Sequence, residues 1–219
     1  MLTQPTLDAA RALVGARLVR DDSTGRRVGR IVEVEAYIGE TDQASHARFG
    51  RTARNEVMYG PAGVAYVYLV YGMYDCLNIV TEPAGHPAAV LVRAVEPLEG
   101  IELIRSARLA ATTARRRAVD DDVRRAAAAR VERLPVDRLA SGPGLVAAAF
   151  GLDRTWTGTD LCDADGRLRL EAIPDTESPP PVRATRRIGV DYAGDDWASR
   201  PWRFVIPGHS SASGPRPVA

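Results

Sequence analysis

Residues 28–37 read VGRIVEVEAY, and this stretch determines which secondary structure stands at the centre of the chain. Apolar and polar side chains alternate along it with a period of two. One set is Val32, Val34 and Ala36, and the other is Ile31, Glu33, Glu35 and Tyr37. Such alternation indicates a β-strand with one face packed on a core. We therefore predict a strand over 28–37 whose other face carries two carboxylates and a phenol.

Further runs of β-branched and aromatic residues predict more strands along the chain. They lie at 64–71 (VAYVYLVY), 76–80 and 88–95 (AAVLVRAV), with shorter ones at 168–173, 187–190 and 202–206. Residues 71–75 link the first two runs as a hairpin turn. Pro97 is expected to end the sheet.

Helix signals are found in four places. Helices are predicted at 7–14, at two Ala- and Arg-rich segments, 101–118 and 123–134, and after Ser141. Thr6 suits the N-cap of the first helix, because its hydroxyl can accept from a free backbone N–H. Ser141 can cap the last one in the same way, and Pro143 fits its first turn.

Composition indicates one soluble globular domain. The chain has 219 residues, of which 45% are hydrophobic and 26% charged. The 29 basic and 28 acidic residues leave a net charge of +1, so any basic surface for nucleic acid must be local. No segment is long and apolar enough to span a membrane, and residues 1–13 do not form a secretory signal. We expect a cytoplasmic protein without membrane contact.

The cysteine and lysine counts exclude two kinds of chemistry. Cys76 and Cys162 have no paired spacing, so neither a zinc site nor a disulfide scaffold is indicated, and both are expected in the core. All 29 basic residues are arginine. Without lysine, the chain cannot use a lysine amine as a nucleophile.

The glutamates of the predicted strand have two interpretations. They are ordinary solvent-facing residues, or Glu35 is a carboxylate held at the edge of a half-buried aromatic surface. Arg93 favours the second interpretation, because it interrupts the apolar run 88–92. An unpaired charge there is costly, so Arg93 requires a carboxylate partner.

Residues 39–63 form a long connection rich in Gly, Asp, Ser, Asn and Arg, and such loops in compact domains are often functional. His46 lies in it, either as a solvated loop residue or as part of a site. Arg48, Arg51 and Arg54 form a local basic rim, which suits phosphate binding or is simply solvated.

Tyrosines gather close to these residues in the sequence. They are Tyr37, Tyr66, Tyr68, Tyr71 and Tyr74. They either place phenols at the surface of a strand pair or form a stacking slot for a flat base.

Several of these stretches together resemble the alkyladenine (3-methyladenine) DNA glycosylase family. The motifs are EVEAYIGETDQASH (33–46), GRTARN (50–55), YVYLVYGMYDCLN (66–78), LVRAVEPLEG (91–100), LASGPG (139–144), RRIGVDYAG (186–194) and PWRFVI (201–206). Individually the short motifs are weak, but the ordered set is specific. The resemblance implies a mixed α/β (α+β) fold, a single compact domain around a curved antiparallel sheet with a protruding β-hairpin.

The resemblance also implies the centre of an active site. Glu35 matches the general base that activates water, and Arg93 matches the arginine beside it. Tyr37, His46 and Tyr68 match the residues that enclose a base flipped out of duplex DNA. Eversion is required because the duplex hides the glycosidic bond.

Other positions match residues that read or hold the DNA. Asn78 matches the residue that crowds the exocyclic amine of normal guanine, and Tyr71 matches the side chain inserted where the flipped base was stacked. We expect four further residues to contact DNA: Arg51, Arg54, Met73 and Tyr74.

The expected protein is therefore a monofunctional glycosylase acting on double-stranded DNA that contains a damaged purine, alkylated or deaminated. It would be a monomer, associated with the nucleoid if bacterial, and need neither metal nor cofactor. The glycosylase domain would span 1–207, with a helical insertion at about 101–134 and a flexible tail at 208–219. Leu145 and Val146 follow SGPG where many relatives carry lysine.

Two other functions fit the same residues. The first is a non-catalytic module that binds distorted or damaged DNA, with Glu35 merely pairing with Arg93. The second is a carbohydrate hydrolase using Glu33 and Glu35. The hydrolase fits poorly, because carboxylates two apart on one strand lie on the same side, whereas glycoside cleavage needs them on opposite sides of the bond.

Overall fold

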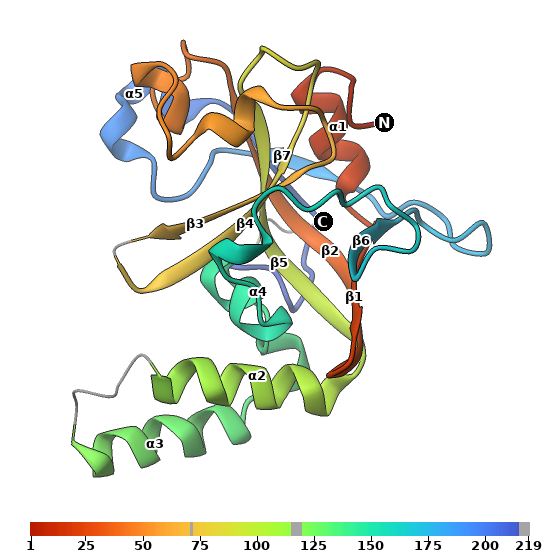
Figure 1. Cartoon of the computed structure of the whole chain (residues 1–219), viewed down its shortest axis with the longest axis vertical. Helices are drawn as coiled ribbons and strands as arrows, with labels where there is room; N and C mark the ends of the chain where they lie inside the picture. Colours follow the sequence, from red (N-terminus) through yellow and green to blue (C-terminus); the bar gives the residue numbers. More distant parts are fainter. Residues whose placement is uncertain (71, 115–119, 215–219) are drawn as a thin grey trace.

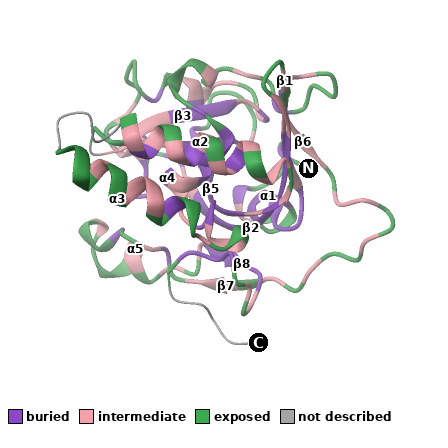
Figure 2. Cartoon of the chain, turned by 90° about the horizontal axis from the view of Figure 1, so that it is seen from below, coloured by how far each residue is buried: buried purple, intermediate pink, exposed green. Residues whose placement is uncertain are grey.

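Two long antiparallel strands form the centre of the fold (Figure 1). The computed structural model describes residues 1–70, 72–114 and 120–214. Strands β2 (Gly25–Ile38) and β5 (Ala88–Glu99) pair along most of their lengths. Both are largely buried, as the colouring of Figure 2 shows, and the buried part includes the charged residues Glu33, Glu35 and Arg93.

The other strands extend this pair on both sides into one curved, antiparallel sheet. Its order is β3-β4-β5-β2-β1-β6, and β8 pairs with both β2 and β7. The added strands are β1 (Arg17–Asp22), β3 (Ala65–Val70), β4 (Tyr74–Val80), β6 (Leu168–Glu171), β7 (Arg183–Thr185) and β8 (Arg203–Val205). The β3–β4 hairpin protrudes from the body (Figure 1). The predicted mixed α/β fold is confirmed.

The pairing of β2 with β5 is interrupted where the charged residues lie. Ile31 pairs with Val95, Glu33 with Ala94 and Val34 with Val92, with register shifts on both sides of Glu33. Val32 and Arg93 therefore fall outside the ladder. Bulges of this kind re-aim side chains, and they often lie next to active sites.

Helices α1 (Thr6–Leu13) and α4 (Pro143–Phe150) supply the apolar side chains that cover one face of the sheet. Their buried residues join Ile31, Val32, Val34 and Ala36 in one core. Because of the bulge, Ile31 is in this core and not on the face with the glutamates, which corrects the simple alternation.

The Ala- and Arg-rich segment folds as a pair of helices. They are α2 (Ile101–Ala114) and α3 (Asp121–Glu132), and they run side by side below the sheet in Figure 1. Arg105 ties them together, since its Nη1 donates to the carbonyls of Val131, Glu132 and Leu134, each at 3.0 Å. These carbonyls lie at or just beyond the end of α3, where the regular hydrogen bonds of the helix end. The Val131 carbonyl also accepts from the N–H of Leu134 at 3.1 Å.

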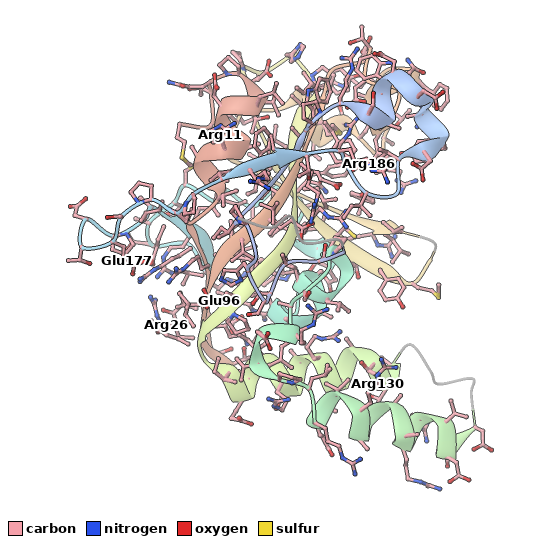
Figure 3. The ribbon with its side chains drawn as sticks, turned by 180° about the vertical axis from the view of Figure 1, so that it is seen from behind. Arg11, Arg26, Glu96, Arg130, Glu177 and Arg186 are labelled. Atoms are coloured by element: carbon pink, nitrogen blue, oxygen red, sulfur yellow. The ribbon has the colours of Figure 1, made fainter. Side chains whose placement is uncertain are left out.

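The remaining regular elements lie in connections. Residues 39–63 contain two 3₁₀ turns, His46–Phe49 and Glu56–Tyr59, and short turns also occur at Val136–Arg138, Arg154–Trp156 and Asp191–Ala193. The five-residue helix α5 (Asp195–Ser199) stands above β3 in Figure 1. The proline-rich connection after β6 projects at the side of the molecule, and its Glu177 pairs with Arg17 at 2.5 Å (Figure 3).

Several local predictions are wrong. The sheet continues through Pro97, which is tolerated because it lies at a register shift opposite Gly29. Residues 187–190 form no strand, and Cys162 is exposed. Thr6 is the first helical residue and not the cap, and Ser141 donates to the carbonyl of Ala212 instead of capping α4.

The expected flexible tail differs most from the structure. Residues 211–213 are buried, and Ser213 is hydrogen-bonded to Glu33. Polar backbone groups, which composition does not report, hold this segment in place. Three parts of the predictions lie outside the described residues: the last part of the predicted tail, 215–219, the end of the predicted helix, 115–118, and Tyr71. Within the described part of the chain, no helix combines the length and apolar character needed to cross a bilayer.

Candidate active site

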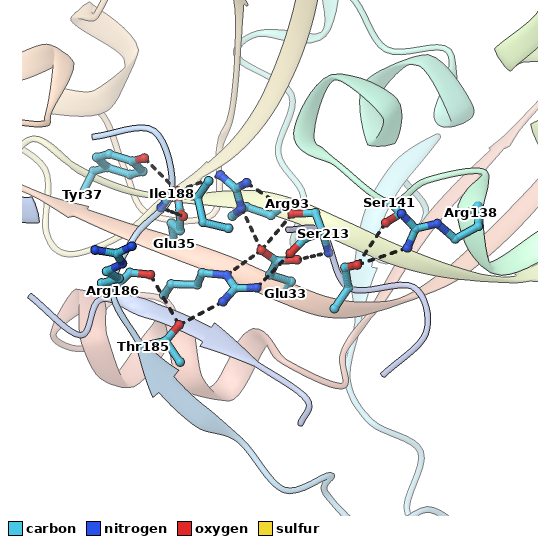
Figure 4. Close-up of polar contacts among 12 residues, drawn as sticks. Glu33, Glu35, Tyr37, Arg93, Arg138, Ser141, Thr185, Arg186, Ile188 and Ser213 are labelled. Carbon is cyan, nitrogen blue, oxygen red and sulfur yellow. Dashed lines mark hydrogen bonds and ion pairs between the residues drawn. The ribbon is translucent and has the colours of Figure 1, made fainter. Parts of the chain in front are cut away.

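The Glu35 carboxylate is completely buried and accepts three hydrogen bonds (Figure 4). Oε2 accepts from the Tyr37 hydroxyl at 2.9 Å and from Arg93 Nη1 at 3.1 Å, and Oε1 accepts from the backbone N–H of Ile188 at 2.7 Å. This burial excludes the solvent-facing interpretation. A carboxylate has about four acceptor sites. Among the described residues, one site on Oε1 therefore stays available.

Arg93 bridges Glu35 to the second buried carboxylate. Its Nε donates to Glu33 Oε1 at 2.9 Å, and Arg203 Nε donates to the same oxygen at 2.7 Å. Two carboxylates and two guanidinium groups thus balance in charge inside the protein. Burial lowers the pKa of Arg93, but the charges of Glu35 and Glu33 outweigh it, and the pKa lies above its ordinary value. Arg93 is therefore a permanent cation beside Glu35.

Tyr37 contacts Glu35 through its hydroxyl and Arg187 through the face of its ring. Burial, and then the charge of Glu35, raise its pKa well above the ordinary value, so the phenol stays protonated and can donate to Glu35. The Arg187 guanidinium lies 4.8 Å from the Tyr37 ring centroid. Arg187 is fixed in turn by Asp42, at 2.7 Å and 2.9 Å, and neither side chain of this ion pair is exposed.

The Tyr37 ring forms one wall of a pocket with about 360 Å³ of empty space, including the part open to solvent. The pocket is lined by Tyr37, Ala44, His46, Met58, Tyr66, Tyr68, Asn78, Ala89 and Tyr192. Glu35 is not in this lining. Its carboxylate lies behind the wall and is connected to the pocket through the Tyr37 hydroxyl.

The lining brings together all four residues that the resemblance assigned to base binding. His46 Nδ1 shares a hydrogen bond of 3.0 Å with the Tyr66 hydroxyl, and the His46 ring lies 4.3 Å from that of Tyr68, at 80°. Asn78 Nδ2 donates to the carbonyl of Tyr66 at 3.2 Å, which fixes the amide at the pocket. The arrangement gives an aromatic pocket whose lining also carries tyrosine hydroxyls, the His46 ring and the Asn78 amide.

Exposed aromatic and cationic groups stand near the pocket opening. Phe49 is 81% exposed and Tyr192 is 64% exposed, although both are large apolar side chains. The Arg48 guanidinium lies 4.6 Å from the Phe49 ring centroid and 5.2 Å from that of Tyr192. Stacking surfaces beside a cation suit a nucleic acid.

The two arginines predicted to contact DNA differ in their surroundings. Arg54 donates to the carbonyl of Leu69 at 3.1 Å and lies 5.6 Å from the Tyr68 ring centroid, so it flanks the pocket. Arg51 pairs with Glu56 at 2.9 Å in an exposed ion pair.

The two hairpin residues predicted to contact DNA, Met73 and Tyr74, differ in exposure. Met73 is 54% exposed at the turn of the β3–β4 hairpin. Tyr74 is half-buried and packs closely against Gly144 of α4. A Cβ added at Gly144 would lie only 2.8 Å from the Cβ of Tyr74, so a larger residue at 144 would collide with it. Tyr71, predicted to insert into DNA, falls outside the described residues.

Comparison with known proteins agrees with this geometry. The family model described as "Methylpurine-DNA glycosylase (MPG)" matches residues 1–210. The chain belongs to the methylpurine-DNA glycosylase family. This places it among the hydrolases that act on N-glycosidic bonds in DNA, with a damaged base as substrate.

Individual relatives give the same result. The chain is 49% identical to a protein of Methanocella arvoryzae over 92% of this chain and 87% of the relative. It is 45% identical to one of Myxococcus xanthus, over 93% and 86%, and 40% identical to one of Bacillus thuringiensis, over 95% and 94%. All three carry the name "Putative 3-methyladenine DNA glycosylase".

Sequence reasoning missed several residues of this site. They are Asp42, Tyr192, Arg187, Ile188, Arg203 and Ser213. Arg203 had a signal, because it precedes the apolar run 204–206 just as Arg93 follows one. The side chain of Ile188 gave no signal, because its backbone N–H makes the contact with Glu35. Ser213 gave none, because it lies in a stretch whose composition resembles a flexible tail.

His46 makes the protein less stable in acid. Burial, and then Arg54 and Arg48, lower its pKa from 6.5 to about 4. Between these two pKa values, His46 binds fewer protons in the folded state than in the unfolded chain. The contribution of His46 to the free energy of unfolding is therefore complete above pH 6.5 and is lost as the pH falls towards 4. The loss is at most about 3 kcal/mol, at about 1.4 kcal/mol per pH unit.

Denaturant unfolding across this pH range measures the effect. We expect the free energy of unfolding of His46→Gln to depend less on pH than that of the wild type. Identical slopes for wild type and His46→Gln would contradict the prediction.

Proposed function

We propose that the chain is a monofunctional DNA glycosylase that everts an alkylated purine and hydrolyses its N-glycosidic bond with a water activated by Glu35. Deaminated purines would be weaker substrates. The observation that carries this proposal is the buried Glu35–Arg93 pair behind the wall of a tyrosine-lined pocket. The family, which acts on methylated purines, supplies the substrate class.

Glu35 can combine two catalytic effects. Its Oε1 has an acceptor site left for a water, and the carboxylate can take the proton as that water attacks C1′ of the nucleotide. The same negative charge would stabilise the positive charge that develops on the sugar. Arg93 donates to both Glu35 and Glu33, so its positive charge is shared between two carboxylates.

The pocket suits an electron-poor purine. Stacking on an aromatic side chain contributes roughly 1–3 kcal/mol per base, and a cationic alkylated base gains more from π faces. An alkylated base also leaves readily, without an acid. A neutral base such as hypoxanthine needs protonation, and His46, with a pKa lowered to about 4, does not supply a proton at neutral pH.

The DNA would lie across the pocket opening. Tyr71 would fill the gap left by the everted base, and Met73 at the exposed turn would approach the same groove. Arg54 would contact phosphates near the pocket, whereas Arg51 would first have to leave Glu56. We expect the enzyme to act as a monomer.

The absence of lysine predicts the product. Glycosylases that also cut the strand usually do so through an amine that forms a Schiff base, and here only the N-terminal amine could serve. We therefore expect an abasic site on an intact strand. Borohydride should trap no enzyme–DNA adduct, and strand breaks should appear only after alkali. A trapped adduct would contradict this prediction.

Single-turnover release of base tests the proposal as a whole. The substrates are duplexes with one alkylated purine, one hypoxanthine or no damage. Release from the first, slower release from the second and none from the third support the proposal. Binding of damaged DNA without any release would favour a non-catalytic binding module. The carbohydrate hydrolase is excluded as a candidate by family membership.

A further inference from the structure

The C-terminal segment 209–214 closes the side of the sheet that carries the two glutamates (Figure 4). Ser213 makes four hydrogen bonds there. Its N–H donates to Glu33 Oε2, and its hydroxyl donates to Glu33 Oε1 at 2.9 Å. The hydroxyl accepts from Arg93 Nη2 at 3.2 Å, and the carbonyl accepts from Arg203 Nη2 at 2.9 Å. One residue thus contacts every other member of the charged cluster except Glu35.

Ser213 completes the set of acceptors around Arg93. The three guanidinium nitrogens of Arg93 each have their own acceptor: Nε has Glu33, Nη1 has Glu35 and Nη2 has Ser213. A planar guanidinium group with three separate acceptors is fixed in one orientation. Without the hydroxyl, a buried donor loses its partner and the guanidinium group can rotate away from Glu35.

Gly214 supports a second donor to Glu35. Its φ is +63°, and an added Cβ would lie 2.7 Å from Cδ1 of Ile188. Only a glycine allows this close approach in a left-handed backbone conformation. Since the N–H of Ile188 donates to Glu35, the segment adjoins two of the three donors that hold the carboxylate.

The segment is anchored from outside the cluster as well. The Ser141 hydroxyl donates to the carbonyl of Ala212 at 3.1 Å, and Arg138 Nη1 donates to that of Ser210 at 3.0 Å. These anchors come from the connection between α3 and α4. They hold the segment without contacting Glu33 or Glu35.

We propose that Ser213 is a positioning residue for base release, which acts by holding Arg93, and through it Glu35, in the orientation that the reaction needs. The inference rests on the proposed role of Glu35. It adds residue 213 to the residues that serve the reaction, and this residue lies beyond those that the family model matches.

Ser213→Ala tests the role, with Ser211→Ala as the matched control. Both serines are buried in the same segment, but the Ser211 hydroxyl has no hydrogen-bond partner among the described residues. We expect Ser213→Ala to slow single-turnover release from an alkylated duplex about tenfold. Affinity for a duplex with an uncleavable analogue should stay within about twofold, and Ser211→Ala should match the wild type in both.

If Ser213 had a purely structural role, its substitution would lower the fraction of folded protein and so reduce the rate and the affinity together. The rates are therefore measured at a temperature at which each variant is fully folded. Ser141→Ala, which loosens the segment from outside the cluster, provides a second measurement, with an expected loss of about threefold in rate and none in affinity.

Three outcomes would overturn the positioning role. They are wild-type release by both Ser213→Ala and Ser141→Ala, equal losses in Ser213→Ala and Ser211→Ala, and a loss of affinity as large as the loss of rate. Failure of the proposed function looks different, because Glu35→Gln would then release base as fast as the wild type.

Discussion

Glu35→Gln is expected to remove base release while leaving DNA binding in place. The amide has nearly the shape of the carboxylate but can neither take a proton from water nor stabilise a positive charge on the sugar. Together these losses should lower the single-turnover rate by a factor on the order of 10³ or more. Binding should change little, because the Glu35 carboxylate does not line the pocket.

Glu33→Gln is the matched control for this prediction. Glu33 is equally buried, lies on the same face of β2 and binds the same arginine. Both substitutions remove one charge from the cluster, and both leave an arginine less well compensated. If Glu35 is the base, Glu33→Gln reduces the rate far less, through the position of Arg93 alone. Equal losses would assign the effect to the charge of the cluster and not to a base.

Much of the central sheet could be predicted from the sequence. The alternation in 28–37 gave β2 and placed the two glutamates and Tyr37 on one face, and the position of Arg93 in an apolar run required a buried carboxylate. Neither observation contained the bulges at Val32 and Arg93, because a bulge depends on the pairing of two strands and not on either one alone. At these bulges Arg93 contacts both carboxylates.

The C-terminal part of the site was hidden for another reason. Residues after Pro207 are rich in Gly, Ser and Pro, a composition typical of flexible tails. Ser213 contributes through its hydroxyl and also through its N–H and carbonyl, and composition does not report the contacts of these backbone groups. Ile188 contributes to Glu35 through its backbone N–H. The resemblance pointed to the side chains that we propose to carry the function, and the structure added the backbone groups that contact them.

The ion pair between Asp42 and Arg187 predicts the largest effect on stability. Both side chains are fully buried, and Arg187 also donates to the carbonyl of Ala36 at 2.9 Å and lies 5.0 Å from the Trp202 ring centroid. Asp42→Ala leaves a buried guanidinium without its carboxylate, which typically costs about 3–5 kcal/mol. Denaturant unfolding should show this loss directly. Activity should fall too, because Arg187 supports the ring of Tyr37.

An exposed ion pair provides the comparison. Glu56 pairs with Arg51 at 2.9 Å, and these side chains are 63% and 60% exposed. Glu56→Ala should cost less than about 1 kcal/mol, because water screens the pair and solvates the arginine that remains. Asp42→Asn should fall between the two alanine variants, since an amide oxygen still accepts hydrogen bonds but no longer neutralises Arg187. A loss for Asp42→Ala no greater than that for Glu56→Ala would mean that water reaches Arg187, and that the wall behind Tyr37 is open to solvent.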